Sequence, residues 1–150
     1  MTFSPRNDKK AIESGLGFAP KFDADGLIVA IAQDESTGEV LMVAYMNERS
    51  LAETLRIGEA VYFSRSRQEI WHKGLTSGHV QKVSAILTDC DQDALVLKVK
   101  QTGGGACHNG FRSCFYRTVI QPATDPVTLR QCIDEKSYDP DSVYGKKQTP

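Results

Sequence analysis

The side chains best suited to chemistry lie in one stretch of this 150-residue chain, TDCDQDALVLKVKQTGGGACHNGFRSCF. Carboxylates bind hard cations such as Mg²⁺, whereas thiolates select softer ions such as Zn²⁺. The stretch holds three of each group, together with His108: Asp89, Asp91, Asp93, Cys90, Cys107 and Cys114. This concentration predicts metal-dependent chemistry.

The three aspartates alternate in sequence with other residues at the end of a predicted strand. In a regular strand, successive side chains point to opposite faces, so Asp89, Asp91 and Asp93 would share one face and Cys90 would occupy the other. One ion would not gather all four groups, so we expect two sites back to back. A solvated hairpin tip, where aspartate is common, is the alternative interpretation.

Three thiolates would leave one position open on a tetrahedral zinc ion. Structural zinc is usually closed by four protein ligands, whereas catalytic zinc keeps a position for water, whose pKa it lowers to about 7. His108 follows Cys107 directly and allows three interpretations. It is a fourth ligand, a general acid/base beside the metal, or a surface histidine.

The run YFSRSRQEIWHKGLTSGHVQK carries positive charges and hydroxyl groups of the kind that bind phosphate. We predict that these residues bind substrate: Ser64, Arg65, Ser66, Arg67, Lys73, Thr76 and Ser77. Trp71 lies among them, and it either stacks on a base or packs into the core.

The elements that must position these residues are mostly strands. The runs LIVAIAQ and EVLMVAYM flank the turn DESTG and predict a β-hairpin, and AVYFS predicts a further strand. Residues 79–101 predict two strands meeting at the acidic turn, and the three glycines at 103–105 then open a flexible loop. Helices are expected at 48–57, between Asn47 as cap and Gly58 as stop, and at 126–135.

Composition limits the organisation of the chain. With 40% hydrophobic and 8% aromatic residues, 150 residues bury one core. Eighteen basic and nineteen acidic residues give a formal charge of -1, which does not indicate nucleic-acid binding. No apolar run approaches the roughly 20 residues of a membrane span, and the N-terminus has no apolar signal region, so we expect a cytoplasmic chain with reduced thiols. Cys132 is then expected to be buried as a small apolar residue.

Several motifs in order closely resemble the phosphoribosyl-AMP cyclohydrolase family of histidine biosynthesis. They are DGLIVAIAQD, GEVLMVAYMN, YFSRSR, W-x-KG-x-TSG, DCDQD and GGGACHNGFRSCFYR. The resemblance covers 22–118, which we take as the cyclohydrolase domain, with extensions at 1–21 and 119–150. Asn109 stands where the motif leads us to expect Thr, a change that leaves the candidate ligands intact.

The resemblance implies that Cys90, Cys107 and Cys114 bind Zn²⁺ and that Asp89, Asp91 and Asp93 bind Mg²⁺. It implies a phosphorylated nucleotide substrate, N1-(5-phosphoribosyl)-AMP, whose adenine ring is opened at N1–C6 by zinc-bound hydroxide to give an aminoimidazole carboxamide. It also implies an intertwined homodimer with metal sites shared between subunits. His108 is our candidate for the general acid/base.

For the fold we expect a compact, sheet-dominated α+β domain with a few short helices. Two other functions remain as alternatives. A zinc-dependent purine nucleotide deaminase would need His-x-Glu and Pro-Cys-x-x-Cys, and neither occurs. A non-enzymatic zinc-binding module would need paired Cys-x-x-Cys motifs, which are also absent from the sequence.

Overall fold

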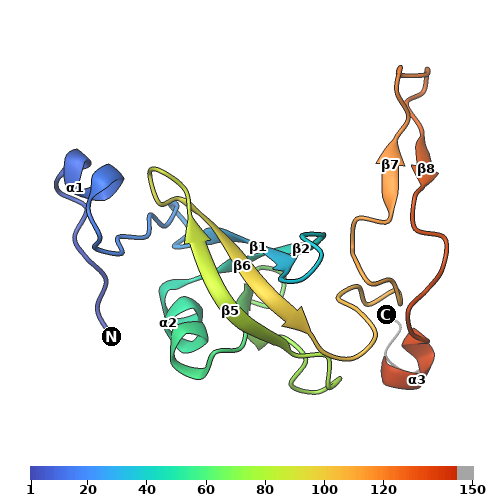
Figure 1. The fold of residues 1–150 in the computed structure, drawn as a ribbon, viewed down its shortest axis with the longest axis horizontal. Helices are drawn as coiled ribbons and strands as arrows, with labels where there is room; N and C mark the ends of the chain where they lie inside the picture. Colours follow the sequence, from blue (N-terminus) through green and yellow to red (C-terminus); the bar gives the residue numbers. More distant parts are fainter. Residues whose placement is uncertain (145–150) are drawn as a thin grey trace.

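The computed structural model describes residues 1–144, so the last six residues of the predicted polar tail lie outside it. Strands predominate and the helices are short, as expected (Figure 1). The elements in chain order are α1 (Lys9–Ser14), β1 (Ile28–Asp34), β2 (Val40–Met46), α2 (Glu48–Ile57), β3 (Val61–Ser64), β4 (Glu69–His72), β5 (Gln81–Thr88), β6 (Ala94–Gln101), β7 (Arg117–Val119), β8 (Leu129–Gln131) and α3 (Pro140–Tyr144). The α+β prediction is confirmed.

Six strands form the main sheet in the order β4-β3-β2-β1-β6-β5. Neighbouring strands are antiparallel except β1 and β6, which run parallel. The predicted hairpin of β1 and β2 is confirmed, and its turn is fixed by Asp34, whose carboxylate accepts the amide hydrogens of Ser36 and Thr37 at 2.8 Å each. These bonds, that from Thr37 foremost, lower the pKa of Asp34. Turn chemistry within five residues thus sets the register of this hairpin.

Helix α2 confirms the predicted cap and stop. The Asn47 side chain accepts the Ser50 amide hydrogen at 2.8 Å, and the Ser50 hydroxyl accepts the Asn47 amide hydrogen at 2.9 Å. Gly58 ends the helix at φ 73°, a left-handed conformation that only glycine adopts without cost. Leu51 is fully buried, whereas Leu55 stays 41% exposed, so the helix packs on the sheet along a narrow stripe.

The core lies between the main sheet and the segments that cover it. Its members are aliphatic residues of β1, β2 and β6 together with parts of α2 and β3, notably Ile28, Met46, Leu51, Tyr62, Leu95 and Leu97. Trp71 is half-buried and packs against this core, with its ring centroid 5.7 Å from that of Tyr62. Among residues 1–144, no helix has the length and apolar character to cross a membrane.

The region after Thr118 differs from the prediction. The helix expected at 126–135 does not form, because Leu129–Gln131 instead pairs antiparallel with Arg117–Val119 as the hairpin β7–β8. Figure 1 shows this hairpin projecting from the body beyond the sheet. Cys132 follows the hairpin and is exposed, so its predicted burial is wrong. Pairing with the preceding strand of the chain has overridden local helical propensity here.

Candidate functional site

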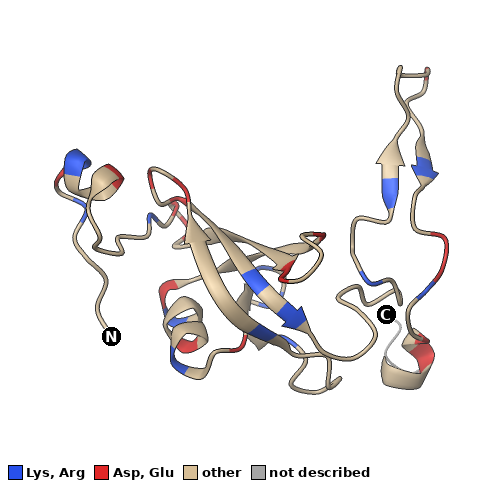
Figure 2. Cartoon of the chain, viewed as in Figure 1, with Lys and Arg blue, Asp and Glu red and all other residues tan. Residues whose placement is uncertain are grey.

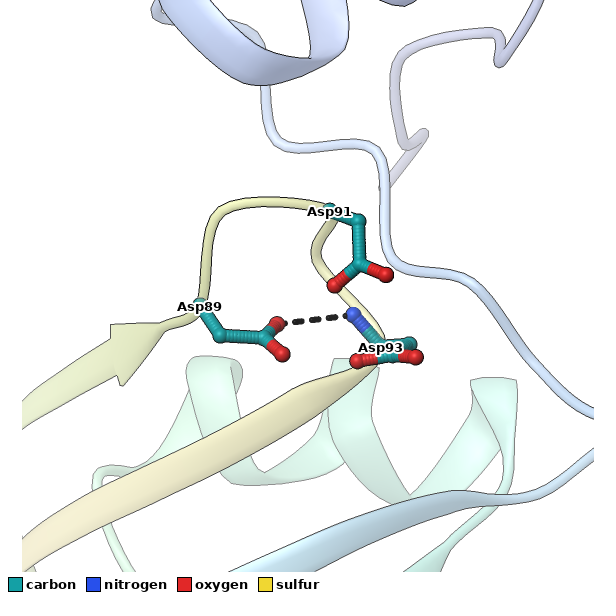
Figure 3. Close-up of side chains that lie close together, drawn as sticks. All are labelled: Asp89, Asp91 and Asp93. Carbon is teal, nitrogen blue, oxygen red and sulfur yellow. Dashed lines mark hydrogen bonds between the residues drawn. The ribbon is translucent and has the colours of Figure 1, made fainter.

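The three aspartates come together in the turn between β5 and β6. One oxygen from each carboxylate lies within 4.8 Å of the others, and Figure 3 shows the three groups facing one another. The Asp89 carboxylate also accepts the amide hydrogens of Asp93 at 2.9 Å and Ala94 at 3.2 Å. The structure thus brings the three carboxylates together. The cause differs from the predicted one, because residues 89–93 form a turn outside the strands and do not alternate along one.

Crowding of negative charge shifts the ionisation of this cluster. Hydrogen bonds with Asp89 and then Asp91 raise the pKa of Asp93 to about 6. At Asp89, slight desolvation acts to raise the pKa of the carboxyl. The hydrogen bonds of Asp89 with Asp93 and Ala94 outweigh this effect and lower its pKa. Three oxygen ligands that repel one another unless a proton or a cation lies between them suit a hard divalent ion.

The N-terminal extension holds the acidic turn. Gln92 stands in the turn at φ 58° with its side chain buried. Its side-chain oxygen accepts the Ala19 amide hydrogen at 2.8 Å, and its side-chain nitrogen donates to the Ile12 carbonyl at 2.9 Å. Arg6 donates to the Asp91 carbonyl at 2.9 Å. Figure 2 shows the acidic turn beside the N-terminal segment, which carries both basic and acidic residues.

Cys107 and Cys114 lie together beyond the end of β6 that is opposite the acidic turn. Cys114 is tied to β2, because its amide donates to the Leu41 carbonyl at 2.7 Å, and Cys107 is buried in a small cluster with Phe111. Cys114 is exposed, yet partial desolvation of its thiol, and then the neighbouring Cys107 sulfur, raise the pKa of that thiol to about 11. A cation bound between two such sulfurs would remove this cost by holding both as thiolates, so the pair fits a zinc ion.

Lys73 lies against the same pair. Its side chain is buried, and its ammonium donates to the Ala106 carbonyl at 2.9 Å. Desolvation lowers the pKa of Lys73, while Cys114 and Cys107 oppose the change. A buried cation beside two sulfurs favours their ionised forms, which supports the assignment of Cys107 and Cys114 as ligands.

Cys90 is not part of this pair within one chain. It is exposed in the acidic turn, and its sulfur lies outside the aspartate cluster. Strand β6 separates the acidic turn from the glycine loop that carries Cys107. This strand has eight residues and is about 23 Å long at the usual rise of a strand. Figure 1 shows the two features at opposite ends of the β5–β6 hairpin. The structure therefore brings together two of the three predicted zinc ligands.

A cavity of about 630 Å³ opens beside Cys114. Among the predicted site residues, it is lined by Arg67, Trp71, Lys73, Thr76, Ser77, His108 and Cys114. His108 is exposed on its wall. The other predicted substrate residues are Ser64, which ends β3, and Arg65 and Ser66 in the turn that follows. They line an adjacent depression, which shares Arg67 and Trp71 with the cavity. One predicted group is thus divided between two neighbouring hollows.

Sequence reasoning missed part of this wall. Met42, Leu75, Phe115 and Tyr144 also line the cavity. Tyr138 and Tyr144 are aromatic residues in an otherwise polar C-terminal region. This contrast was the one sequence feature that could have indicated a buried or site-lining role for Tyr144. A second cavity of about 690 Å³ lies by the glycine loop and includes Asp34, Glu39 and Arg112, but none of the predicted ligands lines it.

The three glycines of that loop are placed by close packing. A Cβ atom on Gly103 would lie 2.1 Å from the His79 ring, one on Gly104 would lie 2.4 Å from Tyr138 Cβ, and one on Gly105 would lie 2.5 Å from the Phe111 carbonyl oxygen. Gly103 also has φ 74°. Flexibility is therefore not the reason for glycine here, because each position excludes a side chain.

Comparison with known proteins gives one consistent result. The family model of phosphoribosyl-AMP cyclohydrolase matches residues 42–116. A phosphoribosyl-AMP cyclohydrolase of Rhodopseudomonas palustris strain TIE-1 is 53% identical over 135 residues, covering 90% of this chain and 89% of the relative. That of Rhizobium etli strain CIAT 652 is 53% identical over 143 residues, covering 95% of each.

A third relative extends the match almost to both ends. The phosphoribosyl-AMP cyclohydrolase of Nitrobacter hamburgensis is 48% identical over 147 residues, covering 98% of this chain and 99% of its own. An alignment of that length includes most of both extensions, which the family model leaves out. The match to the family model and the identity to these relatives agree, and the chain belongs to the phosphoribosyl-AMP cyclohydrolase family.

Proposed function

We propose that this chain hydrolyses the N1–C6 bond in the adenine ring of N1-(5-phosphoribosyl)-AMP, using zinc at its cysteines and magnesium at its aspartates. The assignment of this reaction rests on the family of the chain and on the names of its relatives. The observation that supports its location is the cavity in which Trp71, His108 and Cys114 line one space. A base-stacking ring, a titratable imidazole and a metal-binding thiol are the groups that such a hydrolysis needs.

The substrate carries two phosphates and a purine, and the walls of the cavity suit both. Arg67, Thr76 and Ser77 supply a guanidinium and two hydroxyls for phosphate oxygens. Trp71 offers a half-buried ring for stacking on the base, held in place by its contact with Tyr62. Ser64, Arg65 and Ser66 in the adjacent depression would take the second phosphate.

Cys90, Cys107 and Cys114 would hold the zinc ion. When bound, zinc would act as a Lewis acid and lower the pKa of a water molecule to about 7. His108 would accept the proton of the attacking water and return it to N1. The water oxygen would bond to C6 and its second proton would pass to the exocyclic nitrogen. The N1–C6 bond would break as N1 is protonated, and C6 would become the carboxamide carbon. Asp89, Asp91 and Asp93 would hold Mg²⁺, for which the phosphates are possible further ligands.

The zinc site would be shared between two copies of the chain. Cys90 and the Cys107–Cys114 pair lie at opposite ends of β6, so a three-thiolate site needs Cys90 from a partner. Apolar side chains are exposed beside both halves, with Leu87 at 51% near Cys90 and Phe115 at 53% next to Cys114. A homodimer that joined the two halves would also cover these side chains.

Activity and metal content together test the proposal. With N1-(5-phosphoribosyl)-AMP, the zinc-loaded protein should change the ultraviolet absorbance of the ring without releasing ammonia. Cys114→Ala should lose zinc and essentially all turnover, since two sulfurs cannot hold the ion in its activating geometry. Cys132→Ala is the matched control, because this exposed thiol lies outside the site.

Two results would contradict the proposal. A Cys114→Ala protein with stoichiometric zinc and normal turnover would show that the ligand assignment is wrong. Ammonia released in step with the absorbance change would identify a deaminase.

A further inference from the structure

The chain returns to the cysteine loop after the hairpin β7–β8, in a segment that the family model does not reach. Ile133 is buried against Cys107 and Phe111. The amides of Ser137 and Tyr138 both donate to the Gly110 carbonyl, at 2.7 Å and 3.2 Å. Residues 133–144, which we call the return segment, therefore pack on the loop that carries Cys107 and Cys114.

Tyr138 contacts the backbone of a candidate zinc ligand. Its hydroxyl donates to the Cys107 carbonyl, which also accepts the Gly110 amide hydrogen at 3.0 Å. The Tyr138 ring meets the His79 ring edge to face, with centroids 4.6 Å apart. Its ring is therefore held on one side by the body of the protein while its hydroxyl fixes the peptide group of Cys107.

The loop is built to receive this residue. A Cβ atom on Gly104 would lie 2.4 Å from Tyr138 Cβ, and one on Gly110 would lie 2.6 Å from the Tyr138 carbonyl oxygen. Glycine at both positions is what allows Tyr138 to approach. The return segment then continues to Tyr144, which lines the cavity with His108 and Cys114.

We infer that the return segment is a positioning element for the zinc-binding loop, and that Tyr138 is the positioning residue that sets Cys107 for the metal. The inference rests on the proposed zinc site. Groups that orient metal ligands from behind typically change metal affinity by about 10- to 100-fold when they are removed. A bond to the ligand's own carbonyl restricts the backbone from which its sulfur projects.

Tyr138→Phe tests this role, since it keeps the ring on His79 and removes only the hydroxyl. We expect zinc transfer to a chromophoric chelator to quicken by about tenfold or more. In the cobalt-substituted protein, the thiolate-to-cobalt absorption should shift. At saturating zinc, kcat should fall while KM stays unchanged, because Tyr138 does not line the cavity.

Tyr116→Phe is the matched control. Its hydroxyl lies by the same loop and accepts from the Asn109 side chain at 3.3 Å, but it has no bond to Cys107. Its zinc release should equal that of the unaltered protein. Gly104→Ala gives a second test, because the added methyl group would displace Tyr138 from the loop.

The outcomes separate this inference from the proposed function. If Cys114→Ala loses zinc but Tyr138→Phe and Gly104→Ala both release zinc at the normal rate with an unshifted cobalt spectrum, the positioning role is wrong and the site stands. If Cys114→Ala retains zinc, the site itself is wrong. Thermal unfolding of each variant shows whether a faster release reflects loss of the fold instead, which would also overturn the positioning role.

Discussion

At the scale of single residues, both candidate metal sites consist of groups whose charges oppose one another. Hydrogen bonding with Asp89 raises the pKa of the Asp93 carboxyl to about 6, and desolvation followed by the neighbouring Cys107 sulfur raises the pKa of the Cys114 thiol to about 11. A cation relieves the repulsion in each case, but oxygen ligands favour a hard ion and sulfur ligands a soft one. The two sites should therefore respond separately to substitution.

Asp91→Asn should weaken the magnesium site and leave zinc in place. Losing one ion–carboxylate contact worth at least about 1.4 kcal/mol would raise the required Mg²⁺ concentration about tenfold. Magnesium titration of activity and zinc analysis measure the two effects. Asp25→Asn is the control, because that carboxylate lies outside the cluster. Loss of both metals together from the Asp91 variant would argue against two chemically distinct sites.

The raised pKa of Asp93 predicts how Mg²⁺ binding depends on pH. Because this folded-state pKa of about 6 lies above the ordinary 3.8, the carboxyl's contribution to stability is complete below 3.8 and is lost as pH rises through 6. Mg²⁺ competes with that proton, so Mg²⁺ should raise the unfolding temperature more at about pH 7.5 than at about pH 5. In Asp93→Asn, the difference between the Mg²⁺ effects at the two pH values should shrink. If Mg²⁺ raised the unfolding temperature of the unaltered protein equally at both pH values, competition between Mg²⁺ and the Asp93 proton would be disproved.

At the scale of elements, each candidate metal-binding loop is held by a terminal segment. The acidic turn is held by the N-terminal extension through Gln92, and the cysteine loop is held by the return segment through Tyr138. In the acidic turn this contact holds Gln92 at φ 58°, a left-handed conformation that is unfavourable for residues other than glycine. The extensions thus belong to the architecture of the sites.

Gln92→Ala should detach the N-terminal extension from the acidic turn. Two hydrogen bonds, one buried and one partly buried, at roughly 1 kcal/mol each predict a loss of about 2 kcal/mol in the free energy of unfolding. Urea unfolding measures this loss, and limited proteolysis should cut the extension sooner. Gln68→Ala is a matched control, since Gln68 has φ 54° but is exposed, and its effect should stay within about 0.5 kcal/mol. Equal losses in the two variants would contradict the anchoring role.

At the scale of the whole molecule, the separation of Cys90 from the other two thiols requires an explanation. Strand β6 is a rigid spacer within the sheet, paired with β1 on one side and β5 on the other, so no local rearrangement would bring its two ends together. A second copy of the chain is the simplest source of the missing ligand.

Mixing two inactive variants tests the shared site. In a heterodimer of Cys90→Ala with Cys114→Ala, one site would carry both lesions and the other would carry none. Random exchange of equal amounts gives about half heterodimers, each with one intact site of two, so roughly a quarter of full activity should return. A mixture verified to have exchanged subunits, yet still inactive, would rule out sharing. Cys90→Ala mixed with unaltered protein should keep about half of full activity both before and after exchange, so this mixture controls for inactivation during mixing.

The sequence alone determined the features that depend on neighbouring residues. Asp34 fixes the β1–β2 turn, Asn47 and Gly58 bound α2, and the order of Asp, Cys and Gly motifs identifies the family before any coordinates are known. Caps and turns form from hydrogen bonds within a few residues, so their patterns can be read directly from the chain.

Only the tertiary structure decided which remote segments meet. It separated Cys90 from Cys107, divided Ser64–Ser66 from the cavity, and placed the short strand Leu129–Gln131 within the range 126–135 where a helix was expected. It also placed Tyr138 against the glycine loop, for which the polar sequence around it gave little indication. Such contacts depend on packing between surfaces far apart in the chain, where the energy of each local segment favours no single partner.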